Sequence, residues 1–222
     1  MTPHPDWIIP SWPAPANVRA LITTRAGGVS AGPYASLNLG LRTGDDPQAV
    51  ATNRARLDAL LPHPPKWLRQ VHGCTVVEAD ALADVPEADA GIARRAGTVC
   101  GVLVADCIPV LLADRAGTTV AIAHAGWRGL AADVVGKTIE RMAIGRRSLV
   151  AYLGPGIGPT AFEVGADVRD AFVGRDARSR AAFAPQAPCT PPPGCAEEEA
   201  RYRPRTGVSG RANPGIGRKI SC

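Results

Sequence analysis

The sequence predicts one α+β domain with a mixed sheet, and three observations support this fold class. Continuous apolar runs of strand length occur at residues 99–105, 110–113 and 118–123, as in buried strands. Other segments have helical spacing, and strands and helices do not strictly alternate, which argues against a doubly wound parallel sheet. The 222 residues, of which 45% are apolar and 20% charged, suit a single globular unit with a sizeable core.

The first predicted elements are a short strand and a long loop. Residues 18–24 show an alternating pattern that predicts a strand, and this strand places Arg25 at its end. Residues 26–44 are polar and rich in glycine, which predicts a loop. The loop therefore begins with an arginine.

A helix is predicted next. Asp46 can cap a first helical turn, and Pro47 is tolerated at the first helical position. Apolar residues recur at helical spacing up to about Leu61, beyond which three prolines follow within four residues. We therefore expect the helix to start at Asp46 and to end near Leu61.

The remaining elements follow from the same two periodicities. The predicted strands are 67–71, 75–79, 99–105, 110–113, 118–123 and 148–153, and the predicted helices are 130–143 and 166–173. The composition changes near residue 183. No leucine occurs after Leu153, and residues 185–222 contain twelve Gly or Pro. We expect an N-terminal extension at 1–17, a folded domain at 18–183, and an irregular or disordered tail at 184–222. The tail cannot bury enough apolar area to offset the conformational entropy that it would lose on ordering.

Composition and charge disfavour several functional classes. The net charge is +5, but the tail holds six Lys or Arg against three Glu, and aromatic residues make up only 5% of the chain. A nucleic-acid partner is therefore not expected. No apolar stretch approaches the roughly 20 residues of a membrane span, and residues 1–12 lack the charged and apolar regions of a signal peptide. We expect a cytoplasmic, monomeric protein with no membrane partner.

Three predicted strands end in a residue that can bind a metal. His72, Cys107 and His124 each follow an apolar run. Two imidazoles and a thiolate form a three-ligand site with one open position, as in catalytic zinc sites. The alternative interpretation is structural, because a cysteine at a strand end is often a small buried hydrophobic residue and a histidine can simply bond a carbonyl. The six cysteines include no C-x-x-C pair, so a structural zinc ribbon is not expected.

Two arginines are candidates for anion binding. Arg25 and the amide groups of the glycine-rich loop could cradle a phosphate, although a surface turn with a solvated arginine fits the same pattern. Arg128 follows Trp127 near the predicted helix start, where it could bind an anion or pair with a carboxylate.

Together these segments resemble the YfiH-like family, whose members are described as purine nucleoside phosphorylases or laccase-domain proteins. The matches occur in family order and cover about residues 18–173. They are TTR at 23–25, GGVS at 27–30, SLNLG at 36–40, QVHG at 70–73, ADA at 88–90, ADCIPV at 105–110, HAGWRG at 124–129 and GPGIGP at 154–159.

The resemblance implies a central mixed sheet flanked by helices and a zinc-dependent enzyme. Its implied reaction is the phosphorolysis of adenosine, inosine or S-methyl-5'-thioadenosine to the free base and ribose 1-phosphate, with adenosine deamination as a second activity. The implied metal ligands are His72, Cys107 and His124, and the implied catalytic residues are these three and Arg25. The implied substrate-binding residues are Arg25, Asn38, Gln70, Asp106 and Arg128.

Three alternatives stay open at this point. Cys107 could act as a nucleophile paired with His124 in an amide hydrolase, since some relatives are linked to peptidoglycan-precursor editing. A multicopper oxidase centre needs many more histidines than the four of this chain, but a single Cu²⁺ with polyphenol oxidase activity is an alternative to Zn²⁺. The family pattern stops near residue 183, so the third alternative is a C-terminally incomplete domain without activity.

Overall fold

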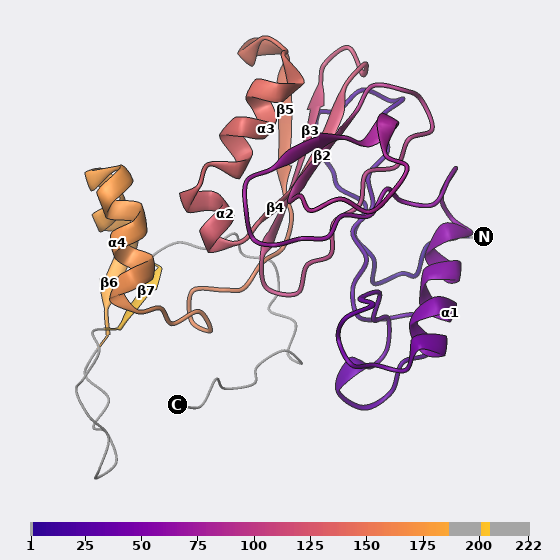
Figure 1. The fold of residues 1–222 in the computed structure, drawn as a ribbon, viewed down its shortest axis with the longest axis horizontal. Helices are drawn as coiled ribbons and strands as arrows, with labels where there is room; N and C mark the ends of the chain where they lie inside the picture. The colour runs from indigo at the N-terminus through magenta and orange to yellow at the C-terminus, as the bar shows by residue number, and fades with distance from the viewer. Residues whose placement is uncertain (1, 187–200, 205–222) are drawn as a thin grey trace.

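The computed structural model describes residues 2–186 and 201–204, and they form a mixed five-stranded sheet with helices and long loops around it (Figure 1). The helices are α1 (Pro47–Asp58), α2 (Trp127–Ala131), α3 (Val134–Met142) and α4 (Ala166–Arg175). The sheet strands are β1 (Val76–Glu78), β2 (Ala90–Ala93), β3 (Ile108–Asp114), β4 (Val120–Ala125) and β5 (Leu149–Leu153). Short 3₁₀ turns lie at Gly32–Tyr34, Ala79–Ala81, Arg146–Ser148 and Ala177–Ala182.

The sheet has the strand order β1-β2-β4-β3-β5. β1 and β2 are parallel, and the other neighbouring strands are antiparallel. This arrangement confirms the predicted mixed α/β fold class. β3 is paired on both sides and almost wholly buried, which explains why its sequence is a continuous apolar run.

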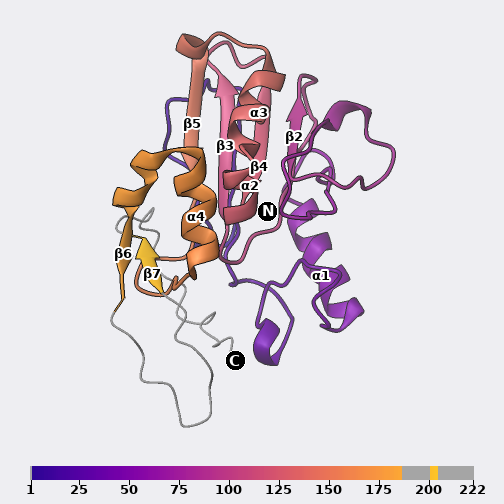
Figure 2. The same cartoon turned by 60° about the vertical axis from the view of Figure 1, so that its left-hand side comes forward.

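The main core lies between the sheet and α3. Ile92 of β2, Leu112 of β3 and Val134 and Met142 of α3 belong to one buried cluster. Figure 2 shows α2 and α3 lying along the same face of the sheet. The single helix predicted for 130–143 is wrong, because Asp133 adopts a left-handed conformation (φ 67°) that separates α2 from α3.

A second apolar cluster joins α1 to the N-terminal segment. Trp7, Leu37, Leu39 and Leu57 are buried together, and the Trp7 indole donates to the Ala26 carbonyl oxygen at 2.8 Å. The residues before 18 therefore pack against the domain. Figure 1 shows the sheet between α3 on one side and α1 with these loops on the other.

The predicted start of α1 is confirmed. The Asp46 carboxylate accepts a hydrogen bond from the Gln48 amide at 3.0 Å, and Pro47 is the first helical residue. The helix ends at Asp58, earlier than the expected end near Leu61.

Three predicted strands are extended segments without a continuous ladder. These segments are 18–24, 67–71 and 99–105, and their residues form only isolated bridges. The bridges join Ile8 to Ile22, Lys66 to Cys100 and Arg69 to Glu87. Only Ile22 and Leu68 of these segments are buried, so an apolar run here accompanies neither full burial nor continuous strand pairing. The predictions for these three segments are therefore wrong.

The last described elements pair with each other beside α4. β6 (Phe183–Pro185) is antiparallel to β7 (Tyr202–Pro204), and Tyr202 also bridges Val164. Most of the predicted irregular segment 184–222 lies outside the described residues, but residues 184–185 and 202–204 are strands, unlike the expectation. The domain boundaries stay predictions. None of the described helices is long and apolar enough to cross a membrane.

Candidate metal centre

The structure brings the three predicted metal ligands together. One ligand atom from each of His72, Cys107 and His124 lies within 4.8 Å of the other two. The two imidazole rings meet edge to face, with their centroids 4.8 Å apart. His124 is 3% exposed, Cys107 is half-buried and His72 is exposed, so the cluster opens to solvent on the side of His72.

Strand register explains how Cys107 and His124 meet. In the antiparallel pair of β3 and β4, Ile108 is opposite Ala125 and Pro109 is opposite His124. Cys107 comes directly before β3 and therefore lies at the same end of the sheet as His124. Two residues that are far apart in the sequence thus become neighbours through the pairing of their strands.

Gly126 leaves the space in which the ligands gather. A Cβ atom at this position would lie 2.9 Å from Cys107 Sγ and 2.9 Å from His72 Cδ2. The backbone of Gly126 is ordinary extended chain (φ −72°, ψ 164°), so glycine is needed here for space rather than for conformation.

Asp89 connects the two imidazole ligands, and sequence reasoning did not assign it any role. Its side chain is fully buried, and its Oδ1 atom lies 2.8 Å from His124 Nδ1. The carboxylate also accepts from the amides of His72 at 3.0 Å and Gly73 at 2.7 Å. The available signal was an acidic residue between two alanines that directly precedes a buried apolar strand.

Burial shifts the titration of the ligands. Desolvation lowers the pKa of His124, an effect that outweighs the opposing hydrogen bond with Asp89, so the imidazole is neutral at pH 7 as a metal ligand must be. Burial raises the pKa of the Cys107 thiol, and the nearby carboxylates of Asp106 and Asp89 raise it further. Partial desolvation of its carboxylate also raises the pKa of Asp106, although the residue as a whole is exposed. A cation bound at this centre would oppose the effect on the pKa of Cys107, because binding to a metal deprotonates a thiol.

The residues present fit a zinc ion better than a multicopper cluster. Ligand atoms around tetrahedral zinc lie about 3.5 Å apart, given bond lengths of about 2.0 to 2.3 Å. Ligand atoms up to 4.8 Å apart must therefore move closer together when a zinc ion binds, and the exposed His72 is the least enclosed of the three. His4 and His63 lie elsewhere, against Gly27 and Gly97. Within the part of the chain that the structure describes, only two histidines therefore belong to the centre.

The glycine-rich loop binds mainly to itself. The amides of Gly28 and Ser30 donate to the side-chain and main-chain oxygens of Ser36, and the amide of Val29 donates to the buried Asn53. The hypothesis that these amides form an open phosphate cradle is therefore wrong, because their hydrogen bonds are used within the protein.

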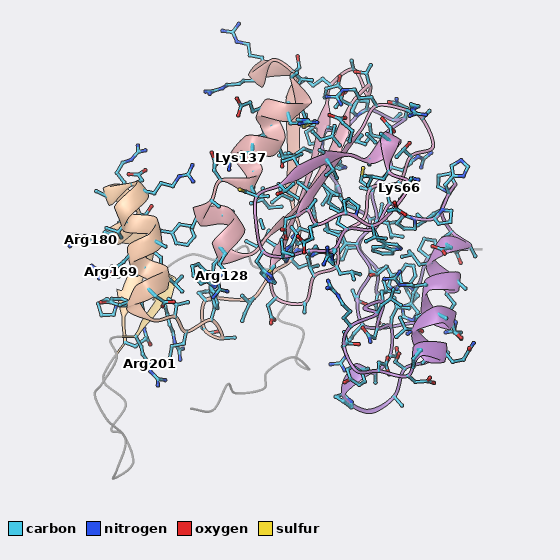
Figure 3. The ribbon with its side chains drawn as sticks, viewed as in Figure 1. Lys66, Arg128, Lys137, Arg169, Arg180 and Arg201 are labelled. Atoms are coloured by element: carbon cyan, nitrogen blue, oxygen red, sulfur yellow. The ribbon has the colours of Figure 1, made fainter. Side chains whose placement is uncertain are left out.

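Arg25 and Arg128 are better placed for a ligand. Arg25 donates through Nε to the Ala35 carbonyl oxygen at 2.7 Å, and no described residue forms a hydrogen bond or ion pair with its terminal nitrogens. Arg128 is exposed at the start of α2, and its guanidinium lies 4.3 Å from the ring centroid of Trp127 (Figure 3). Both roles in substrate binding stay predictions.

The other predicted substrate-binding residues have structural contacts. The side chain of Asn38 bonds to the Gly40 amide, Thr43 and Asp45, all within its own loop. Gln70 donates to the Leu103 carbonyl and accepts from the Leu103 amide, both at 2.7 Å. These bonds explain the two residues without a ligand, and their substrate contacts stay predictions.

Asp106 has a different position, next to a metal ligand. Its backbone carbonyl accepts from the Ile157 amide at 2.8 Å, which places the loop 154–159 beside Cys107. Its side chain belongs to an exposed residue and is available to a ligand, so its predicted substrate contact stays a prediction.

The chain is similar to proteins with known names and to solved structures. A family model described as multi-copper polyphenol oxidoreductase laccase matches residues 19–194. A purine nucleoside phosphorylase of Pseudomonas aeruginosa is 55% identical over 181 residues, which cover 82% of this chain and 74% of that protein. The Escherichia coli purine nucleoside phosphorylase YfiH is 51% identical over 179 residues, with coverage of 79% and 74%.

Solved structures agree with these relatives. A Neisseria meningitidis protein of the DUF152 family is 44% identical, covers 90% of this chain and 78% of its own, and has a TM-score of 0.81. YlmD from Geobacillus stearothermophilus is 31% identical, with coverage of 86% and 75% and a TM-score of 0.66. The chain therefore belongs to the YfiH-like family, the family of the multi-copper polyphenol oxidoreductase laccase model.

Proposed function

We propose that this protein is a zinc-dependent purine nucleoside phosphorylase with adenosine deaminase as a second activity. Its substrates are then adenosine, inosine or S-methyl-5'-thioadenosine, together with phosphate. The observation that carries the proposal is the cluster of His72, Cys107 and His124, which is open to solvent. It occurs in a chain that is 55% and 51% identical to two proteins with the name purine nucleoside phosphorylase.

The candidate residues have side chains that suit this chemistry. In phosphorolysis, a phosphate oxygen forms a bond to C1' of the ribose while the bond from C1' to the purine nitrogen breaks and the base leaves with that electron pair. His72, Cys107 and His124 would hold a zinc ion, which would supply positive charge and Lewis acidity. Arg25, whose Nε donates to the Ala35 carbonyl oxygen, would bind the phosphate through its terminal nitrogens and keep it near C1'.

Product analysis with and without phosphate tests the reaction. We expect purified, zinc-loaded protein to release hypoxanthine from inosine only when phosphate is present, and to convert adenosine to inosine. Chromatography separates these products, and elemental analysis identifies zinc or copper. His72→Ala should lose both metal and activity, whereas His63→Ala should keep both, because His63 packs against Gly97 away from the cluster.

The possible results separate the candidate functions. Hypoxanthine release that does not need phosphate would contradict phosphorolysis. A protein that holds copper and oxidises phenols would support the polyphenol oxidase alternative. A zinc-loaded, folded protein without either nucleoside activity would support the inactive domain.

One observation favours a thiol hydrolase as the second candidate. The carboxylate of Asp89 contacts the imidazole of His124, and a ligand atom of His124 lies within 4.8 Å of Cys107 Sγ. Acid, base and thiol therefore follow one another as in a catalytic triad. Such an enzyme would be inhibited by thiol alkylation and would stay active after metal chelation. The proposed phosphorylase would lose activity on chelation.

A further inference from the structure

We propose that Asp89 is the positioning residue of the metal centre, with a role in presenting both imidazoles to a divalent cation. This inference rests on the metal centre of the proposed function but not on the reaction carried out there. Asp89 is fully buried, and within the described part of the chain its carboxylate forms hydrogen bonds only with backbone N–H groups and an imidazole nitrogen.

The first action of Asp89 is on the imidazole of His124. A carboxylate only accepts hydrogen bonds, so the 2.8 Å contact from Asp89 Oδ1 to His124 Nδ1 places the ring proton on Nδ1. The lone pair is then on Nε2, the nitrogen that remains for a metal. The amide of His124 also donates to the Asp89 carbonyl at 2.7 Å, so the ring and its backbone are held by the same residue.

The second action is on the turn that carries His72. The amides of Val71, His72 and Gly73 donate to the Asp89 carboxylate at 3.3, 3.0 and 2.7 Å. His72 has a φ of 59°, in the left-handed region that a side chain other than glycine rarely adopts. Three convergent hydrogen bonds from consecutive amides stabilise this conformation, which directs the exposed imidazole.

The charge of Asp89 also suits a metal centre. Among the described residues no lysine or arginine forms an ion pair with it, and the basic group beside it is the imidazole of His124. A buried carboxylate without a cationic side chain is costly. A divalent cation held by His124 would balance that charge through the imidazole, as in carboxylate–histidine–zinc arrangements.

Zinc affinity of the Asp89→Asn variant tests the inference. The amide places N–H donors where the carboxylate accepted, so it must oppose either the amides of the His72 turn or the Nδ1 proton of His124. We expect zinc affinity, measured by competition with a chromogenic chelator, to fall about 10- to 100-fold. Circular dichroism reports whether the variant is folded.

Asp114→Asn is the matched control. Asp114 is also a buried carboxylate that accepts from backbone amides, those of Thr118 and Thr119, but it lies at the opposite end of β3 from Cys107. This variant should lose a similar amount of stability and keep the parental zinc affinity. An equal loss of zinc affinity in both variants would show a general structural effect and would overturn the proposal.

A measurement on the parent protein covers the case in which Asp89→Asn does not fold. Long-range ¹H–¹⁵N NMR should show His124 with its proton on Nδ1, both before and after zinc is added, and zinc bound through Nε2. Metal bound at Nδ1 of His124 would overturn the inference.

Parental zinc affinity in folded Asp89→Asn would overturn it as well, while the metal centre and the proposed reaction would stand. A parent protein that binds no zinc would overturn the metal centre and this inference together, whereas a zinc-loaded parent without phosphorolysis would contradict only the proposed reaction.

Discussion

Replacing Gly126 by alanine should fill the metal centre while leaving the fold intact. The new Cβ would lie 2.9 Å from both Cys107 Sγ and His72 Cδ2. Unstrained contacts between such atoms are about 3.5 to 4.0 Å, so each ligand must move by roughly 0.6 to 1 Å. Metal–ligand distances tolerate only about 0.2 Å. We therefore expect zinc affinity to fall at least about tenfold, which corresponds to about 1.4 kcal/mol.

The assay is a zinc titration in competition with a chelator, together with thermal unfolding of the metal-free protein. Alanine is compatible with the backbone angles of Gly126, so the metal-free variant should unfold cooperatively, near the parental temperature. Gly145→Ala is the control, because a Cβ there has no atom within 4 Å. Parental zinc affinity in a folded Gly126→Ala protein, or equal loss in the control, would refute the reasoning.

Two further predictions concern stability. Burial alone would raise the pKa of Asp114, but hydrogen bonds from Thr118 and from the Thr119 amide outweigh it and hold the pKa below its usual value. The stabilisation is therefore fully present above the unfolded pKa of about 4 and is lost as pH falls through the lower folded pKa. Asp114→Asn should lower the free energy of unfolding by about 1 to 3 kcal/mol at pH 7. Urea unfolding should show a smaller difference between variant and parent at pH 3 than at pH 7, and an equal difference at both would contradict this prediction. Gln70→Ala should cost about 1 to 3 kcal/mol in the same assay, because it leaves both backbone groups of Leu103 without their partner; unchanged stability would show that this pair does not hold the segment.

Similar apolar patterns in this chain belong to different structures. Residues 110–113 lie in β3, which pairs with both β4 and β5. Residues 99–105 are similarly apolar, yet only Cys100 forms a bridge. Residues 110–113 are buried, whereas none of residues 99–105 is. Burial and a strand ladder both depend on which segments lie alongside, and that is decided by the rest of the fold.

The glycine-rich loop shows the same limit for a candidate site. Its composition indicated free backbone amides for an anion, but the buried side chain of Asn53 enters the loop from α1 and accepts from Val29, while its own amide donates to Ser30 and Ser36. Nothing in the loop sequence identifies this partner, which lies 24 positions from Val29. Tertiary contacts therefore decide which backbone amides of the loop stay available to bind a ligand.

Residue type and local chemistry by themselves determined which side chains could bind a metal and where α1 begins, because ligand preference and helix capping depend on a few adjacent atoms. Only the tertiary structure decided that His72, Cys107 and His124 meet within 4.8 Å and that Asp89 holds two of them. Asp89 and His124 are separated by 35 positions in the chain. Such pairs are joined by strand register and by the closure of loops, and both depend on the packing of the whole domain.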